Sequence, residues 1–227
     1  MRNWGLVVTL FYALIIVVLL VPIAVWLGVG IDATGWTGFY LHVKEAYATW
    51  FTWIIVAVPV LGEFLLLFLR VDTSQKRLRP RTHILVSSIT TAFFLGLLTF
   101  AGVLGVGVAL RGDKSMPDGV LPVMGTIVVA WAAWAIIFYR VHRDSSDAIS
   151  RAVTWLLRGS VLELLIAVPA HVIVRRRGDC SAPVATSFGI TSGLAIMLLA
   201  FGPSVLLLYK QRIDRYSMKA SAGGKSL

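Results

Sequence analysis

The chain has 227 residues, of which 58% are hydrophobic and only 14% are charged, and its formal net charge is +10 at pH 7. A soluble protein is about 45–50% apolar and about 25% charged. A chain this apolar could not cover its surface with polar groups in water. The composition therefore excludes an ordinary soluble protein and predicts an integral membrane protein with one domain.

The basic residues lie between apolar runs rather than on one soluble face. This pattern indicates contact with the lipid bilayer and its anionic headgroups, and it argues against binding of nucleic acid. A homo-oligomer or a larger membrane complex is compatible with the sequence. The single cysteine excludes an intrachain disulfide and any metal site built from several thiolates.

A membrane-spanning helix needs about 20 mostly apolar residues. Six segments meet or nearly meet this requirement, which predicts an all-α bundle of six transmembrane helices within residues 1–217. Residues 218–227 are small, polar and basic, and they predict a disordered cytoplasmic tail. The first span has no small-residue cleavage site and is expected to remain as an anchor. The expected spans are 6–27, 49–69, 84–110, 120–139, 155–174 and 184–209.

The basic loops predict the orientation of the bundle. The second loop, the fourth loop and the C-terminal segment are rich in Lys and Arg, whereas the first and third loops are not. Because basic loops stay in the cytoplasm, both termini are expected to be cytoplasmic and the protein to lie in the cell membrane.

One cluster departs from this rule. Arg175, Arg176 and Arg177 close the fifth span at its expected outer end. Two interpretations remain open. The arginines could extend to the headgroups as a membrane anchor, or they could form an outer site for an anion or a lipid headgroup.

The first outer loop, residues 30–50, has aromatic and apolar residues at three- and four-residue steps, the spacing of one helix face. We expect a short interfacial helix there, lying along the outer surface. The residues in this pattern are Trp36, Phe39, Tyr40, Val43, Tyr47 and Trp50.

Small residues recur in two spans, where they allow close approach of helix backbones. The sixth span carries them at four-residue spacing, and these faces are expected to contact neighbouring helices. The small residues are Gly96, Gly102, Gly105 and Gly107 in the third span and Ala185, Gly189 and Gly193 in the sixth.

Two acids, Glu63 and Glu163, lie within expected spans. A charge at mid-helix costs about 2.5–3.5 kcal/mol, so each must be protonated, paired or exposed to water. Both are expected about 10–12 Å from the inner edge, where they could meet as a proton- or cation-binding pair. The alternative is that each is bonded to an Arg or a hydroxyl and joins two helices.

Two further residues complete the candidate proton, ion or substrate site. Arg158 does not share a helix face with Glu163, so a salt bridge to Glu63 is the hypothesis for it. His171 lies at the outer end of the fifth span. Pro59 and Pro169 could permit helix breaks beside the two glutamates.

The four histidines form a second pattern. His42 and His171 are expected at the outer face, and His83 and His142 at the inner face. Two haems with two histidine ligands each would need such pairs. At least three of the four lie at or beyond the membrane edge, which is too shallow for a haem in the bundle. We therefore expect interfacial histidines and no cofactor or metal.

No protease, hydrolase or nucleotide-binding motif occurs in the sequence, which argues against an enzyme. The leading hypothesis is a small proton- or ion-linked transporter. The alternatives are a non-catalytic accessory subunit of a membrane complex and a b-type haem electron carrier.

Overall fold

The structure, a computed structural model, describes residues 2–29, 31–68, 81–115, 119–142, 148–179 and 181–201. These residues form helices joined by short turns, and no strand occurs among them. The predicted tail and residues 202–209 of the sixth predicted span lie outside the described residues. The helices are α1 (Arg2–Ile15), η1 (Ile16–Leu20), α2 (Val21–Val29), α3 (Ile31–Ala48), α4 (Trp50–Phe68), α5 (Arg81–Arg111), η2 (Gly112–Ser115), α6 (Val120–His142), α7 (Ala148–Arg177) and a further helix, Ala182–Phe201.

Five of the helical segments are long and apolar enough to cross a membrane, and a bent pair would make a sixth span. The pair consists of Gly35–Ala48 and Trp50–Leu66, which meet at 71°. The all-α architecture expected from composition is therefore confirmed for the described residues, and five or six of their helical segments are long and apolar enough to span a membrane. The five unbent segments are Leu6–Val29, Val86–Arg111, Leu121–Val141, Arg151–Arg177 and Ala182–Phe201.

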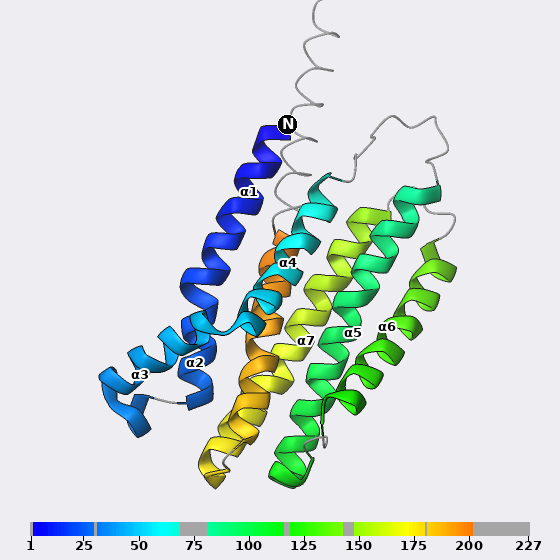
Figure 1. The fold of residues 1–227 in the computed structure, drawn as a ribbon. Coiled ribbons are helices and arrows are strands. Elements are labelled where there is room, and N and C mark those ends of the chain that lie inside the picture. Colours follow the sequence, from blue (N-terminus) through cyan, green and yellow to red (C-terminus); the bar gives the residue numbers. More distant parts are fainter. Residues whose placement is uncertain are drawn as a thin grey trace, which may run out of the picture.

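The helices run up and down side by side (Figure 1). We call the end of the bundle where α1 begins the upper end. At the same end α4 and α6 finish, and α5 and α7 begin. The ends of α2, α5 and α7 lie at the opposite, lower end. This alternation is the arrangement that successive membrane crossings require.

The helix Ala182–Phe201, which we call the central helix, contacts α1, α2, α4 and α7. The Tyr12 hydroxyl of α1 donates to the carbonyl of Ala195 at 2.8 Å. Gly28 of α2 lies beside Ser187. The glycines Gly189 and Gly193 contact α7. The central helix has no charged residue and presents small residues to its neighbours, so helix backbones approach closely around it.

Helix α5 lies between α6 and α7, and glycines mark both contacts. A Cβ on Gly96 would lie only 2.9 Å from the backbone nitrogen of Trp131 in α6. On the other side, Gly159 of α7 lies beneath Leu95 and Leu98 of α5. The prediction that small residues face neighbouring helices is confirmed at Gly96, and at Gly189 and Gly193 of the central helix.

The first span contains a wide turn at η1. The N–H of Val21 donates to the carbonyl of Ile16, five residues back, and this leaves the carbonyl of Val17 without its usual helical partner. Pro22, which has no N–H, follows directly. The hydroxyl of Tyr47 donates to Val17 at 2.5 Å and so satisfies the freed carbonyl. This bond fastens α3 to the first span.

A helix forms where the interfacial helix was expected, although α3 is broken at Gly35, whose φ of 64° suits glycine. Phe39, Val43 and Tyr47 are half-buried, whereas Trp36 and Tyr40 are exposed. Figure 1 shows α3 leaving the bundle sideways before α4 rises to the upper end.

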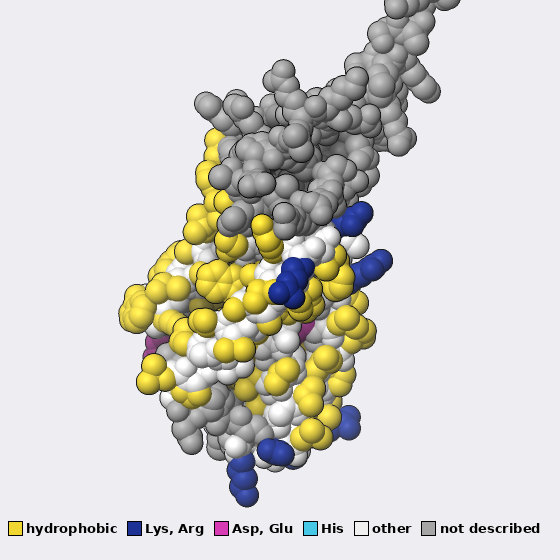
Figure 2. All heavy atoms as spheres, turned by 90° about the vertical axis from the view of Figure 1, so that its right-hand side faces the viewer, with side chains coloured by type: hydrophobic (Ala, Val, Ile, Leu, Met, Phe, Trp, Pro, Cys, Tyr) yellow, Lys and Arg dark blue, Asp and Glu magenta, His cyan; other side chains and the backbone are white. Residues whose placement is uncertain are grey.

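The surface of the bundle is apolar between its ends. Figure 2 shows hydrophobic side chains over most of the described part of one face, with Lys and Arg gathered above and below a band that lacks them. Aliphatic side chains such as Leu121, Val129 and Leu165 are at least 66% exposed. Such a surface fits hydrocarbon better than water.

Candidate functional site

Glu163 is buried at the middle of α7, with 3% of its surface exposed. Its carboxyl group lies in a space that two glycines of the central helix leave open, which we call the glycine slot. A Cβ on Gly189 would lie 2.8 Å from Oε1 of Glu163, and a Cβ on Gly193 would overlap Oε2. Only glycine at both positions leaves room for the carboxyl group.

Glu63 is fully buried in α4, four residues after Pro59. The preceding residue, Gly62, lies directly against the ring of Phe94 in α5, and a Cβ there would be 3.5 Å from Leu199 of the central helix. Helix α1 also packs against α4. Glu63 therefore sits where α1, α4, α5 and the central helix converge.

All four carboxylate oxygens of Glu63 and Glu163 are buried without a hydrogen-bond partner. Buried polar atoms are normally bonded, and an isolated charge in such a place is very costly. The two carboxyl groups share no hydrogen bond with each other. The structure thus places two separate carboxyl groups beside one helix.

One further buried hydroxyl group was not singled out by the sequence. Oγ1 of Thr91 in α5 is also buried without a hydrogen-bond partner. Most hydroxyls of the central helix bond instead to carbonyls three or four residues back, as Ser192 does to Gly189 at 2.9 Å. The sequence alone does not show whether a threonine in an apolar run bonds to a carbonyl of its own helix or has no partner.

Arg158 is exposed on α7 and donates no hydrogen bond to either glutamate, since none of their oxygens has a partner. The structure does not join it to Glu63. His171 is buried nearer the lower end, and its Nδ1 lies 2.8 Å from Oγ1 of Thr186 in the central helix. His171 therefore ties α7 to the central helix, two helical turns from Glu163.

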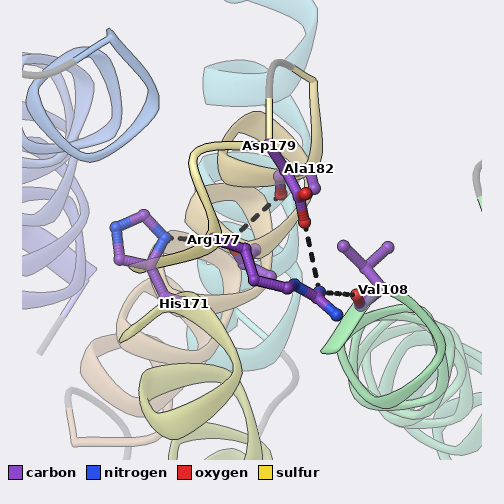
Figure 3. Close-up of polar contacts among 6 residues, drawn as sticks. Val108, His171, Arg177, Asp179 and Ala182 are labelled. Atoms are coloured by element: carbon purple, nitrogen blue, oxygen red, sulfur yellow. Dashed lines mark hydrogen bonds and ion pairs between the residues drawn. The ribbon is translucent and has the colours of Figure 1, made fainter. Parts of the chain in front are cut away.

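The arginine cluster reaches the ends of two other helices. Nη2 of Arg175 donates to the carbonyl of Leu27 at 2.5 Å, near the end of α2. Nη2 of Arg177 donates to the carbonyl of Val108 at 2.8 Å, near the end of α5. It also lies 3.1 Å from Oδ2 of Asp179, an ion pair without hydrogen-bond alignment. Figure 3 shows Arg177 reaching between Val108 and Asp179.

These contacts give the arginines a structural role. The last carbonyls of a helix lack intrahelical partners and carry partial negative charge, so a cation there is favourable. Because α2, α5 and α7 all end at the lower end, arginines at the end of α7 can cap the other two. Arg176, between them, is exposed.

The described residues contain no group of three or more His, Cys, Asp and Glu side chains close enough to hold a metal ion. His42 lies 3.4 Å from Glu45 of its own helix, and His171 is engaged with Thr186. The side chains of His83 and His142, and the whole of Cys180, lie outside the described part of the chain.

Compared with known proteins, the chain matches no protein-family model, no curated protein and no solved structure. The functional assignment therefore depends on the geometry of the buried carboxyl groups.

Proposed function

We propose that this protein is a small proton- or ion-linked membrane transporter in which Glu63 and Glu163 take up and release the coupling ion. One observation carries the proposal: both glutamates are buried in apolar helices with no hydrogen-bond partner for any carboxylate oxygen. A glutamate that only joins helices would be bonded to a neighbouring group. An intramembrane carboxyl group without such a bond is expected to serve a pathway for protons or ions.

The surrounding helices offer a way for these groups to change their surroundings. Pro59 lies one turn before Glu63 in α4, and Pro169 lies six residues after Glu163 in α7. Each proline removes one backbone hydrogen bond, which eases bending at that point. Bending of α4 or α7 away from the central helix would admit water to the adjacent carboxyl group.

The proposal includes an orientation. The upper end of the bundle would face the cytoplasm, since α4 ends and α5 begins there on either side of the basic sequence 70–81, and α6 ends and α7 begins there on either side of the basic sequence 140–151. Both termini would then be cytoplasmic in a six-span chain of the cell membrane, with α3 along the outer surface. Arg176 would be the arginine of the cluster free to meet an outer anion or a lipid headgroup. Arg158 and His171 would adjust the path on either side of Glu163.

The test uses purified protein in lipid vesicles that contain a pH-sensitive dye. A pH gradient is imposed, and Na⁺, K⁺, phosphate, mixed amino acids and mixed sugars are added one at a time outside. At least one addition is expected to speed the collapse of the gradient. Glu163→Gln should abolish the effect and remain folded, since the amide keeps the size of the neutral carboxyl group.

The chain offers a matched control. Glu45 is the one remaining glutamate of the sequence besides Glu63 and Glu163, and its side chain is 75% exposed in α3. Glu45→Gln should transport as the unchanged protein does. If no addition affects the gradient, or if Glu163→Gln is as active as the unchanged protein, the transport proposal fails. A partner complex that co-purifies with the unchanged protein and not with Glu163→Gln would support the accessory subunit instead.

A further inference from the structure

We infer that the glycine slot makes Glu163 a site for a proton and excludes metal cations. This inference rests on the proposed function, because it names the ion that the proposed transporter would bind at this position. Two observations support it: the groups around the carboxyl group of Glu163 are apolar, and too few oxygen ligands surround it to bind a metal cation.

The walls of the glycine slot are apolar. The glycines Gly189 and Gly193 bring the backbone of the central helix against the two carboxylate oxygens. A Cβ on Gly189 would also lie 3.3 Å from Cβ of Ala167, and one on Gly193 would lie 3.0 Å from Cγ of Leu164. The carboxyl group is thus held between a helix backbone and aliphatic side chains of its own helix.

A metal cation would lack ligands at this position. Oxygen-seeking cations such as Ca²⁺ take about six to eight oxygen atoms at about 2.3–2.6 Å, and Mg²⁺ needs a nearly octahedral set. Glu163 supplies two oxygens. The hydroxyl of Ser192, next to Gly193, donates to the carbonyl of Gly189, and that of Ser160 in α7 donates to the carbonyl of Leu157. Glu63 shares no hydrogen bond with Glu163, and the described residues place no group of three or more His, Cys, Asp and Glu side chains together that could hold a metal ion.

A proton needs no ligand sphere. It neutralises the carboxyl group where it lies, and a neutral polar group in an apolar place costs far less than an isolated charge. The slot therefore fits the protonated form. Release of the proton would leave an unpaired charge against the glycines, so release requires α7 and the central helix to separate. The glycine slot would in this way link the protonation of Glu163 to the position of the central helix.

Among the described residues, no other titratable group bonds to the carboxyl group of Glu163. The hydroxyl of Tyr12 in α1 donates to the carbonyl of Ala195, and Glu63 of α4 shares no hydrogen bond with Glu163. The central helix has no titratable group along its length. On α7 the nearest titratable groups are Arg158 and His171, five and eight residues away, and neither bonds to Glu163. The span of α5 carries only Arg111, at its lower end. A proton that is gained or lost in the glycine slot is therefore gained or lost by the carboxyl group of Glu163.

The test is infrared difference spectroscopy of the purified protein in lipid nanodiscs, which detects the carbonyl stretch of a protonated carboxylic acid. A band from Glu163 is expected near neutral pH. It should be absent in Glu163→Gln and present in Glu45→Gln. Gly193→Ala should shift or remove it by forcing the carboxyl group out of the slot, whereas Gly125→Ala, at a glycine with open space around it, should leave it unchanged.

The decisive step is to add Na⁺, K⁺, Ca²⁺ or Mg²⁺ at constant pH. The band should keep its full intensity, whereas its loss on adding any of these ions would overturn the inference. The unchanged protein suffices for this step, so a failure of Glu163→Gln to fold would not prevent the decision. A cation-resistant band without flux in vesicles would keep the proton site and reject the transporter. A flux driven by a cation that removes the band would keep the transporter and reject the proton site.

Discussion

The contact between α5 and α6 at Gly96 allows a sharp test of the helix packing. Alanine at this position would place its Cβ 2.9 Å from the backbone nitrogen and 3.1 Å from Cα of Trp131, closer than real Cβ atoms approach backbone. The obstacle is a helix backbone rather than the end of a flexible side chain. Two hydrogen bonds beside it, from Trp131 to Ile89 and from Trp134 to Thr99, hold α6 in place. Gly96→Ala must therefore push the two helices apart.

A second substitution separates the free-energy cost of overpacking at Gly96 from the intrinsic effect of replacing glycine by alanine in a helix. Gly125 lies in α6, and a Cβ there would meet nothing within 4 Å. Both substitutions gain about 0.5–1 kcal/mol from the lower backbone entropy of alanine. Only Gly96→Ala also suffers overpacking, which costs about 1–3 kcal/mol. The two variants should thus differ by about 1–3 kcal/mol, or about 5- to 150-fold in the unfolding equilibrium constant.

The free energy of unfolding is measured in mixed micelles by titration with a denaturing detergent, with helix content as the signal. Gly125→Ala should be at least as stable as the unchanged protein, and Gly96→Ala clearly less stable. If the two variants unfold together, the close approach of α5 and α6 described above is wrong.

Other contacts give smaller tests by the same titration. Tyr47→Phe leaves the freed carbonyl of Val17 without a donor and should lower stability by about 1–3 kcal/mol, while Tyr40→Phe, at an exposed position, should not; equal stability of the two variants would remove the role given to the Tyr47 hydroxyl. Arg177→Gln removes a cation from the end of α5 and should lower stability by about 1 kcal/mol, whereas Arg176→Gln should change it by less than about 0.5 kcal/mol. A larger loss for Arg176→Gln would contradict the capping assignment.

Local composition was enough to predict the helices and their packing faces. The third predicted span, 84–110, corresponds to α5, and the fourth, 120–139, begins where α6 begins. Apolar length alone determines such segments. The four-residue spacing of Gly189 and Gly193 likewise predicted a contact face, because spacing along one helix is a local property. The prediction did not extend to what that face contacts.

Features that join distant segments were beyond the sequence. The arginines at the end of α7 were interpreted as an anchor or an anion site, and this interpretation did not include the bonds of Arg175 and Arg177 to carbonyls near the ends of α2 and α5. The sequence did hold one usable signal. Because α2, α5 and α7 cross the bundle in the same direction, they end at the same level, and their last carbonyls need donors there. Similarly, Pro22 marked a disturbed turn, but only the fold shows that Tyr47 supplies the missing donor. The glycine slot around Glu163 could likewise be identified only once the packing of α7 against the central helix was known.

The position of the central helix has a consequence for the biogenesis of the protein. The ribosome makes Tyr12 long before Ala195, which follows 183 residues later and accepts the hydrogen bond of Tyr12. During translation the earlier helices are therefore made before the central helix, which packs between them in the finished protein. Glu163 has no partner backbone until then. A nascent chain stalled before residue 182 should therefore remain bound to the insertion machinery, where crosslinking would detect it.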